Sequence, residues 1–146
     1  MTVTAGLERT VPRRQPRVLL VDDDPALRTL YRFNLEASGM EVVEAPDGES
    51  ALERVRERLP DVVLLDVMMP GIDGWEVARR LASDPLTARV PIIFITALAD
   101  DASREQGVSS GAIGYLVKPF NPVQLASEIE ALLAAAADDD TQAEWE

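Results

Sequence analysis

Acidic side chains follow two short apolar runs of the sequence directly. Asp22, Asp23 and Asp24 come after one run, and Asp66 comes after another. Oxygen ligands without histidine or cysteine favour Mg²⁺, which binds through one or two carboxylates and recruits phosphate oxygens. A carboxylate beside such an ion can act as a nucleophile toward phosphorus. The pattern therefore predicts an acidic Mg²⁺ site, with Mn²⁺ as the alternative ion, and Asp66 as a phosphoryl acceptor.

A hydroxyl and an ammonium group stand at the ends of two further runs. Thr96 closes one run, and Lys118 follows the next. Lysine occurs only at Lys118 among 14 basic side chains. This pattern is explained either by a specific need for a compact ammonium at that position or by codon usage. An ammonium would offset charge on transferred phosphoryl oxygens, and a hydroxyl would donate a hydrogen bond to one of them.

Each acid also has a structural interpretation. An acid at the end of a strand commonly caps the following helix, and Asp24, directly before Pro25, is interpreted in that way. For the other three acids, capping and function are equally supported when each is taken alone. The hydroxyl and the lone ammonium expected beside them favour function for all three. Tyr115 has a structural interpretation as well, as a strand tyrosine with its ring in the core.

Five apolar runs predict the strands that must position these side chains. Because the runs are apolar throughout rather than alternating, both faces of the sheet should be covered. Strands of this kind, separated by helices, predict a parallel α/β sheet with helices on both sides. The carboxyl ends of such strands meet at one edge, where ligands bind. The predicted strands are 18–21, 41–45, 62–65, 91–96 and 113–117.

The predicted helices begin at a capping side chain followed by apolar residues at helical spacing. Glu76, three residues after one of these caps, completes a pattern typical of a capping box. The polar segment 100–110 predicts a weaker helix because Gly107 and its serines are poor helix formers. Together with the strands, these helices make five βα units in one domain. The caps are Asp24, Asp47, Asp73 and Asn121.

Composition excludes several classes of function. The chain of 146 residues has no cysteine and no histidine, so thiolate sites, disulfides and phosphohistidine are excluded. A formal net charge of −12 argues against direct nucleic acid binding. With no apolar run long enough for a membrane span and no signal peptide, we expect a cytoplasmic protein that binds no membrane. The expected organisation is a basic tail over 1–16, a domain over 17–137 and an acidic tail over 138–146.

Four motifs in order resemble the receiver domains of bacterial two-component response regulators. The resemblance covers residues 17–137 and is closest to a stand-alone, chemotaxis-regulator-like receiver. It implies a flavodoxin-like, doubly wound sheet of five parallel strands in the order 2-1-3-4-5, with five helices on two faces. The motifs are VLLVDDDPALR at 18–28, VVLLDVMMPGIDG at 62–74, PIIFITA at 91–97 and GYLVKPF at 114–120.

The resemblance also implies a role for each matching residue. Phosphorylation would fall on Asp66, with Mg²⁺ held by Asp23, Asp66 and the backbone carbonyl of Met68, and with Asp22 assisting through a metal-bound water. Lys118 would contact the phosphoryl group, and the bond to its following proline resembles the cis bond of the family. Thr96 and Tyr115 would be the switch residues, which move on activation.

Departures from the family pattern bear on lifetime and assembly. In the family, the residues two positions after the phosphorylated aspartate and after the threonine help to place the hydrolytic water. Here they are Met68 and Leu98, both apolar, so we expect slow self-dephosphorylation. Ile113 and Gly114 stand where receivers that dimerise often carry an acidic pair, so we expect a monomer or a weak dimer.

The expected function is that of a phosphorylation-activated switch rather than an enzyme. The phosphoryl donor would be a histidine kinase or a phosphotransfer protein, and the output would be a contact with a downstream protein or a phosphorelay. Three alternatives stay open. One is a phosphatase of the haloacid dehalogenase type, which also uses an aspartate nucleophile, but at the end of its first strand. The others are a receiver that is never phosphorylated and a fragment of a longer transcriptional regulator.

Overall fold

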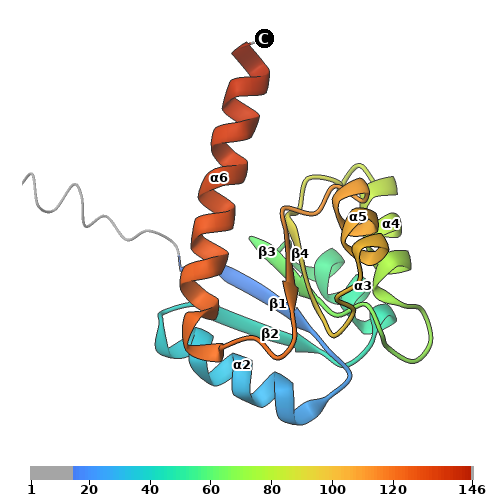
Figure 1. Cartoon of the computed structure of the whole chain (residues 1–146), viewed down its shortest axis with the longest axis vertical. Helices are drawn as coiled ribbons and strands as arrows, with labels where there is room; N and C mark the ends of the chain where they lie inside the picture. Colours follow the sequence, from blue (N-terminus) through green and yellow to red (C-terminus); the bar gives the residue numbers. More distant parts are fainter. Residues whose placement is uncertain (1–14, 146) are drawn as a thin grey trace, which may run out of the picture.

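Five parallel strands form one sheet in the order β2-β1-β3-β4-β5 (Figure 1). The computed structural model describes the backbone of residues 15–145 and the side chains of residues 15–138, so the N-terminal segment 1–14 lies outside the described residues. The predicted fold class and strand order are confirmed, with strand ends within one residue of those predicted. The strands are β1 (Arg17–Val21), β2 (Glu41–Ala45), β3 (Val62–Leu65), β4 (Ile92–Thr96) and β5 (Gly114–Val117).

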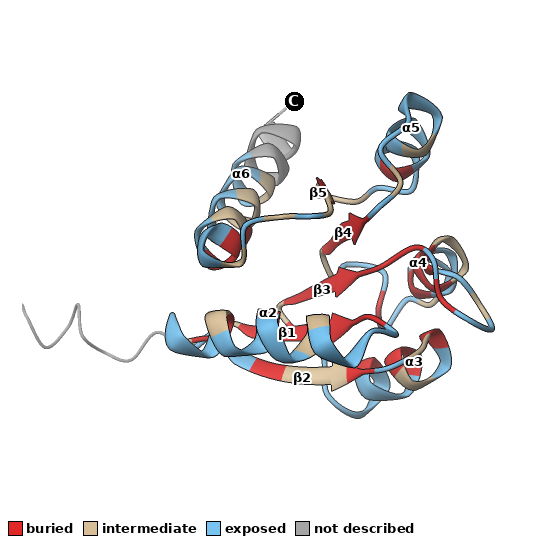
Figure 2. Ribbon diagram, turned by 60° about the horizontal axis from the view of Figure 1, so that its bottom comes forward, coloured by how far each residue is buried: buried red, intermediate tan, exposed pale blue. Residues whose placement is uncertain are grey.

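Helices cover both faces of this sheet, as Figure 2 shows with the buried strands lying between them. Helices α2 and α6 lie on one face, and α3, α4 and α5 lie on the other. No helix within residues 15–145 combines the length and hydropathy that a membrane span requires. The helices are α2 (Pro25–Ala37), α3 (Gly48–Glu57), α4 (Gly74–Ser83), α5 (Asp101–Ser109), the short 3-10 helix η1 (Pro122–Gln124) and α6 (Leu125–Trp145).

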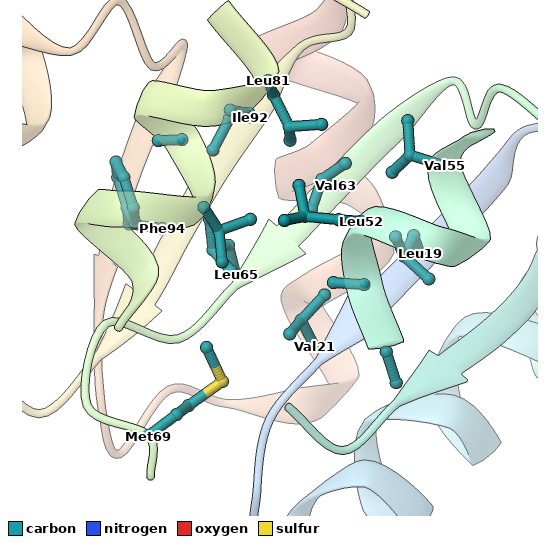
Figure 3. Packing of buried hydrophobic residues seen from close by; sticks show 14 of the residues in the cluster. Leu19, Val21, Leu52, Val55, Val63, Leu65, Met69, Leu81, Ile92 and Phe94 are labelled. Atoms are coloured by element: carbon teal, nitrogen blue, oxygen red, sulfur yellow. The ribbon is translucent and has the colours of Figure 1, made fainter. Parts of the chain in front are cut away.

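The side chains of each strand alternate between two hydrophobic cores. In β1, Leu19 and Val21 pack under α3 and α4, whereas Val18 and Leu20 pack under α2 and α6. Figure 3 shows the first of these cores, in which Phe94 lies near Leu65 and Ile92. Because successive strand residues point to opposite faces, burial on both sides requires an uninterrupted apolar run. This double burial explains the apolar runs that identify the strands in the sequence.

The helix caps follow the predictions with two corrections. Asp24, Asp47 and Asp73 each accept a backbone N–H from the first turn of their helix. The capping box at α4 is only half formed, because the Glu76 carboxylate pairs with Arg79 and Arg80. Arginine offers this carboxylate a charged partner, which is stronger than a neutral backbone donor. The last helix is also preceded by η1, so Asn121 caps a 3-10 turn first.

The last helix continues past the domain boundary expected at residue 137. Helix α6 begins at Leu125, and its backbone is helical as far as Trp145. The expected acidic tail over 138–146 therefore begins inside α6. Its separation from the domain remains a prediction, as does the basic tail, which falls largely on the segment outside the described residues.

Close packing at Gly74 fixes the loop between β3 and α4. A Cβ atom at this position would overlap the carbonyl oxygen of Asp66 and lie 2.7 Å from Cα of Val67. The N–H of Gly74 donates to the carbonyl of Val67 at 2.8 Å. The start of α4 therefore packs against the backbone that carries Asp66, and only glycine leaves the space for it.

Replacing Gly74 with alanine should destabilise the fold by about 1–3 kcal/mol, as overpacking does, because the clash is with backbone atoms that cannot turn away. Urea unfolding measures this change. Ala82→Gly, at an exposed position of α4, is the reciprocal control and should cost about 0.5–1 kcal/mol, because glycine is disfavoured in helices where space is free. A Gly74→Ala protein as stable as the parent would contradict this account of the loop.

Candidate functional site

The carboxyl edge of the sheet brings together two buried acids and the single lysine. Asp22 is fully buried at the end of β1, and Asp66 is 4% exposed at the end of β3. The Lys118 ammonium, at the end of β5, lies 2.8 Å from Oδ2 of Asp22 and 3.0 Å from Oδ2 of Asp66. Three strands thus supply one ion-paired cluster, in which the predicted acids and lysine are direct neighbours.

Asp22 is held through each of its polar atoms. Its N–H donates to the carbonyl of Ala45 at 3.2 Å, and its Oδ1 accepts the N–H of Asp24 at 2.9 Å. Its Oδ2 accepts from Lys118, and its own carbonyl accepts from the guanidinium of Arg28 at 2.5 Å. Both oxygens of the Asp22 carboxylate are therefore already engaged by hydrogen bonds.

Burial and the neighbouring charges shift the pKa values of Asp66 and Lys118. Burial raises the pKa of Asp66 above its ordinary value, and the charge and hydrogen bond of Lys118 offset only part of that rise. Burial by itself would lower the pKa of Lys118, but its hydrogen bonds and charge attraction to Asp22 and Asp66 outweigh this effect and raise it. Lys118 therefore remains charged at neutral pH and supplies the positive charge that the buried acids require.

Asp23 completes an acidic cluster that could hold a divalent cation. Asp23 is exposed, and one carboxylate oxygen from each of Asp22, Asp23 and Asp66 lies within 4.8 Å of the other two. All three donors are oxygen atoms, and one side of the cluster is open to solvent. This donor set fits Mg²⁺, which prefers few carboxylates and retains several waters. The residues that could hold such an ion are Asp22, Asp23 and Asp66.

The loop after Asp66 carries the next predicted site residue. The N–H of Met68 donates to Oδ1 of Asp66 at 3.3 Å, and the Met68 side chain is 57% exposed. Met68 and Leu98, from separate loops, line one hollow of about 540 Å³. Apolar side chains dominate this hollow, and its other lining residues are Val67, Met69, Pro70, Asp73 and Trp75.

The two predicted switch residues are linked through one residue of the loop between β4 and α5. Thr96 is fully buried, and its Oγ1 accepts the N–H of Leu98 at 3.3 Å. The hydroxyl of Tyr115 donates to the carbonyl of Leu98 at 2.7 Å. The ring of Tyr115 packs against Phe94, with ring centroids 6.1 Å apart. Tyr115 is half-buried, with its ring packed against the first core and its hydroxyl reaching the loop.

Arg28 belongs to the site although the sequence pattern assigned it no role. Its guanidinium contacts the carbonyl of Asp22 and the carboxylate of Glu44, the latter at 2.9 Å. Arg28 thereby ties the end of β1 to β2. Its position six residues after an acid, one helical turn into α2, is a weak signal, because arginines on helices are usually solvated. Gly74 was equally unassigned, although its place in the Gly-Ile-Asp-Gly turn is a stronger hint.

Comparison with known proteins identifies relatives of one kind. The family described as "Response regulator receiver domain" matches residues 18–130. The chain is 44% identical over 121 residues to the phosphate regulon transcriptional regulatory protein PhoB of Rhizobium meliloti, covering 83% of this chain and 53% of that protein. It is 45% identical over 116 residues to the response regulator PleD of Caulobacter vibrioides, covering 80% of this chain and 26% of that protein. The chain thus spans about half, or less, of the length of these relatives.

Solved structures of similar sequence share the fold. A response regulator from Chloroflexus aurantiacus is 37% identical, with a TM-score of 0.78, over 83% of this chain and 99% of that one. The chemotaxis protein CheY4 of Vibrio cholerae is 32% identical, with a TM-score of 0.76, over 81% of this chain and 98% of that one. Both matches cover nearly the whole of the compared chain, so the likeness extends over a complete domain.

Replacing Asp66 with asparagine should stabilise the metal-free protein at neutral pH. Because the folded-state pKa of Asp66 is raised, ionisation of this acid costs stability, and the cost builds up as the pH rises from 3.8 to the raised pKa and is complete above it. The advantage of the variant should therefore shrink as the pH falls through the raised pKa toward 3.8, the ordinary value. Thermal unfolding of both proteins across this range measures the difference.

Mg²⁺ should stabilise the parent protein more than it stabilises Asp66→Asn. At a hundredfold excess over its Kd, the ion should stabilise the parent by about 2.7 kcal/mol. Asp66→Asn should lose most of this gain, whereas Asp101→Asn, an exposed acid of α5, should retain it. Equal stabilisation of the parent and Asp66→Asn would remove Asp66 from the metal site.

Proposed function

Since the chain belongs to the response regulator receiver domain family, we propose that Asp66 accepts a phosphoryl group and thereby turns a signalling switch on. The observation that carries this proposal is the cluster at the carboxyl edge of the sheet. There, a nearly buried carboxylate lies 3.0 Å from an ammonium, beside two further acids that suit a divalent cation. The proposal extends the family's phosphorylation-controlled function to named residues.

Phosphoryl transfer needs a positioned nucleophile and compensation of charge. In the proposed step, a carboxylate oxygen of Asp66 forms a bond to phosphorus, and the bond from phosphorus to the donor atom breaks. The electron pair of that bond goes to the leaving nitrogen of a phosphohistidine or to the leaving oxygen of acetyl phosphate. The Lys118 ammonium, already within 3.0 Å of the carboxylate, then pairs with the phosphoryl oxygens.

The metal ligands would be Asp23, Asp66 and the backbone carbonyl of Met68, with Asp22 acting through a water. When bound, Mg²⁺ offsets negative charge on the phosphoryl oxygens and so favours transfer to an acid. Asp22 is buried and held by four hydrogen bonds, so its position beside the site is fixed. Mn²⁺ has similar preferences for oxygen ligands and is the alternative ion.

The switch would operate through the loop that follows β4. Thr96 would turn its hydroxyl toward a phosphoryl oxygen, giving up the hydrogen bond from the N–H of Leu98. Tyr115 is joined to the carbonyl of the same residue, so a movement of this loop alters the surroundings of its ring. One added charge at Asp66 would thus bias the arrangement of α5 and β5.

The proposed partners are a histidine kinase or phosphotransfer protein as donor and a downstream protein as target. The proposed contact for output is the surface around α5, β5 and α6, beside the proposed switch residues. For a stand-alone chain, this contact would be with a separate protein. The curated relatives are longer regulators, in which the same surface would meet an attached domain.

Acetyl phosphate with Mg²⁺ should add one phosphoryl group to the parent protein and none to Asp66→Ala. The reason is that the receiver pattern puts the acceptor at the acid that ends β3, and Asp66 stands there beside an ammonium and candidate metal ligands. Intact mass spectrometry measures the adduct, and omission of Mg²⁺ should abolish it. An adduct of equal yield in Asp66→Ala would exclude Asp66 as the acceptor. Repeated turnover of a generic phosphate ester would favour the phosphatase alternative.

The phosphorylated protein should lose its phosphoryl group slowly. Met68 and Leu98 line a common hollow with apolar side chains, and neither can hydrogen-bond an attacking water. Met68→Asn combined with Leu98→Glu should shorten the lifetime by about tenfold, below the roughly 10²–10⁴-fold of a well-placed general base. Loss of phosphate after removal of acetyl phosphate gives the rate. A lifetime of seconds in the parent would contradict the prediction.

A further inference from the structure

The ring of Tyr115 occupies a narrow space under α5. Phe94 lies beneath it, with the ring centroids 6.1 Å apart. The guanidinium carbon of Arg104 lies over it, 5.6 Å from the ring centroid. In this position the hydroxyl donates to the carbonyl of Leu98 at 2.7 Å. Contacts from β4, from α5 and from the loop between them thus define one place for the ring.

Gly107 is the residue of α5 that leaves this space open. It is buried, and a Cβ atom built on it would lie 2.7 Å from Cδ2 and 3.2 Å from Cε2 of Tyr115. Carbon atoms in favourable contact are about 3.5–4.0 Å apart, so the ring and a side chain at this position exclude each other. Glycine is a poor residue for a helix interior, and here it occurs where the ring approaches closest.

The space matters because the ring holds the loop that connects the two switch residues. Leu98 accepts a hydrogen bond from Tyr115 at its carbonyl and donates one to Thr96 from its N–H. If the ring leaves its place, the first of these bonds is lost, and Leu98 keeps only its bond to Thr96. The conformation of the loop beside Thr96 therefore depends on the absence of a side chain at Gly107.

We propose that Gly107 is a positioning residue that keeps the Tyr115 ring under α5 and thereby sets the conformation of the loop between β4 and α5. This inference deepens the proposed function, because its consequence for signalling rests on the switch roles of Thr96 and Tyr115. The packing relation itself concerns the unphosphorylated protein and can be tested there.

The test is a double-mutant cycle between the two positions, measured as Tm. With Tyr115 present, Gly107→Ala should lower Tm by about 3–5 °C or more, because the new methyl group displaces the ring. In the Tyr115→Ala background, the same substitution should raise Tm by about 3–5 °C, because alanine is the better helix former once the ring is gone. Ser109→Ala, an exposed position of α5, is the matched control and should shift Tm equally in both backgrounds.

A change of equal sign and size in both backgrounds would overturn the proposal. A Gly107→Ala protein that fails to fold, while the double variant folds, would support it in its strongest form. The amide resonance of Leu98 gives a second readout, since Tyr115→Phe removes the hydroxyl but keeps the ring. In Gly107→Ala this resonance should move toward its position in Tyr115→Phe, and an unmoved resonance would count against the proposal.

The same samples separate this inference from the proposed function. Labelling of the parent by acetyl phosphate tests Asp66, whereas the cycle needs no phosphoryl group. Coupling without labelling would reject the proposed function and leave the packing role of Gly107 standing. Labelling without coupling would reject the role of Gly107 and leave the acceptor role of Asp66 standing.

Discussion

The pairing of Lys118 with two buried acids is the interaction on which the site depends. Asp22 and Asp66 come from different strands, and both are buried within 3.0 Å of the same ammonium. Burying charged groups is costly unless they are paired. A single ammonium serves both, which fixes the ends of β1, β3 and β5 relative to one another. The ammonium compensates only partly for the burial of Asp66, because the pKa of this acid is still raised. This partial compensation suits the proposed role of Asp66 as a phosphoryl acceptor beside a cation.

Much of this arrangement could be predicted from the sequence because the signals are local. Apolar runs are required where a strand is buried on both faces, and the acids, Thr96 and Lys118 stand directly at the ends of such runs. Parallel order then places strand ends at one edge without further information. Asp24 could be assigned to a helix cap for the same reason, since Pro25 follows it.

What the sequence could not reveal depends on close approach between distant segments. Nothing near Arg28 indicates that its guanidinium reaches the carbonyl of Asp22, and nothing near Gly107 indicates a ring from β5. Glycine in a helical segment was interpreted as weakness of the helix, whereas its lack of a side chain makes room for Tyr115. Glu76 shows the same limit, since its arginine partners, rather than the helix N-terminus, determine where its carboxylate points.

The alternation of β5 between the two cores has a consequence for how partners can bind. Tyr115 belongs to the core under α4 and α5, whereas its neighbour Leu116 belongs to the core under α2 and α6. In the proposed switch, a displaced Tyr115 ring would therefore act first on the core under α4 and α5. A protein that must recognise both proposed states equally would be expected to bind α2, on the other face of the sheet. A protein that must discriminate between them needs the opposite side.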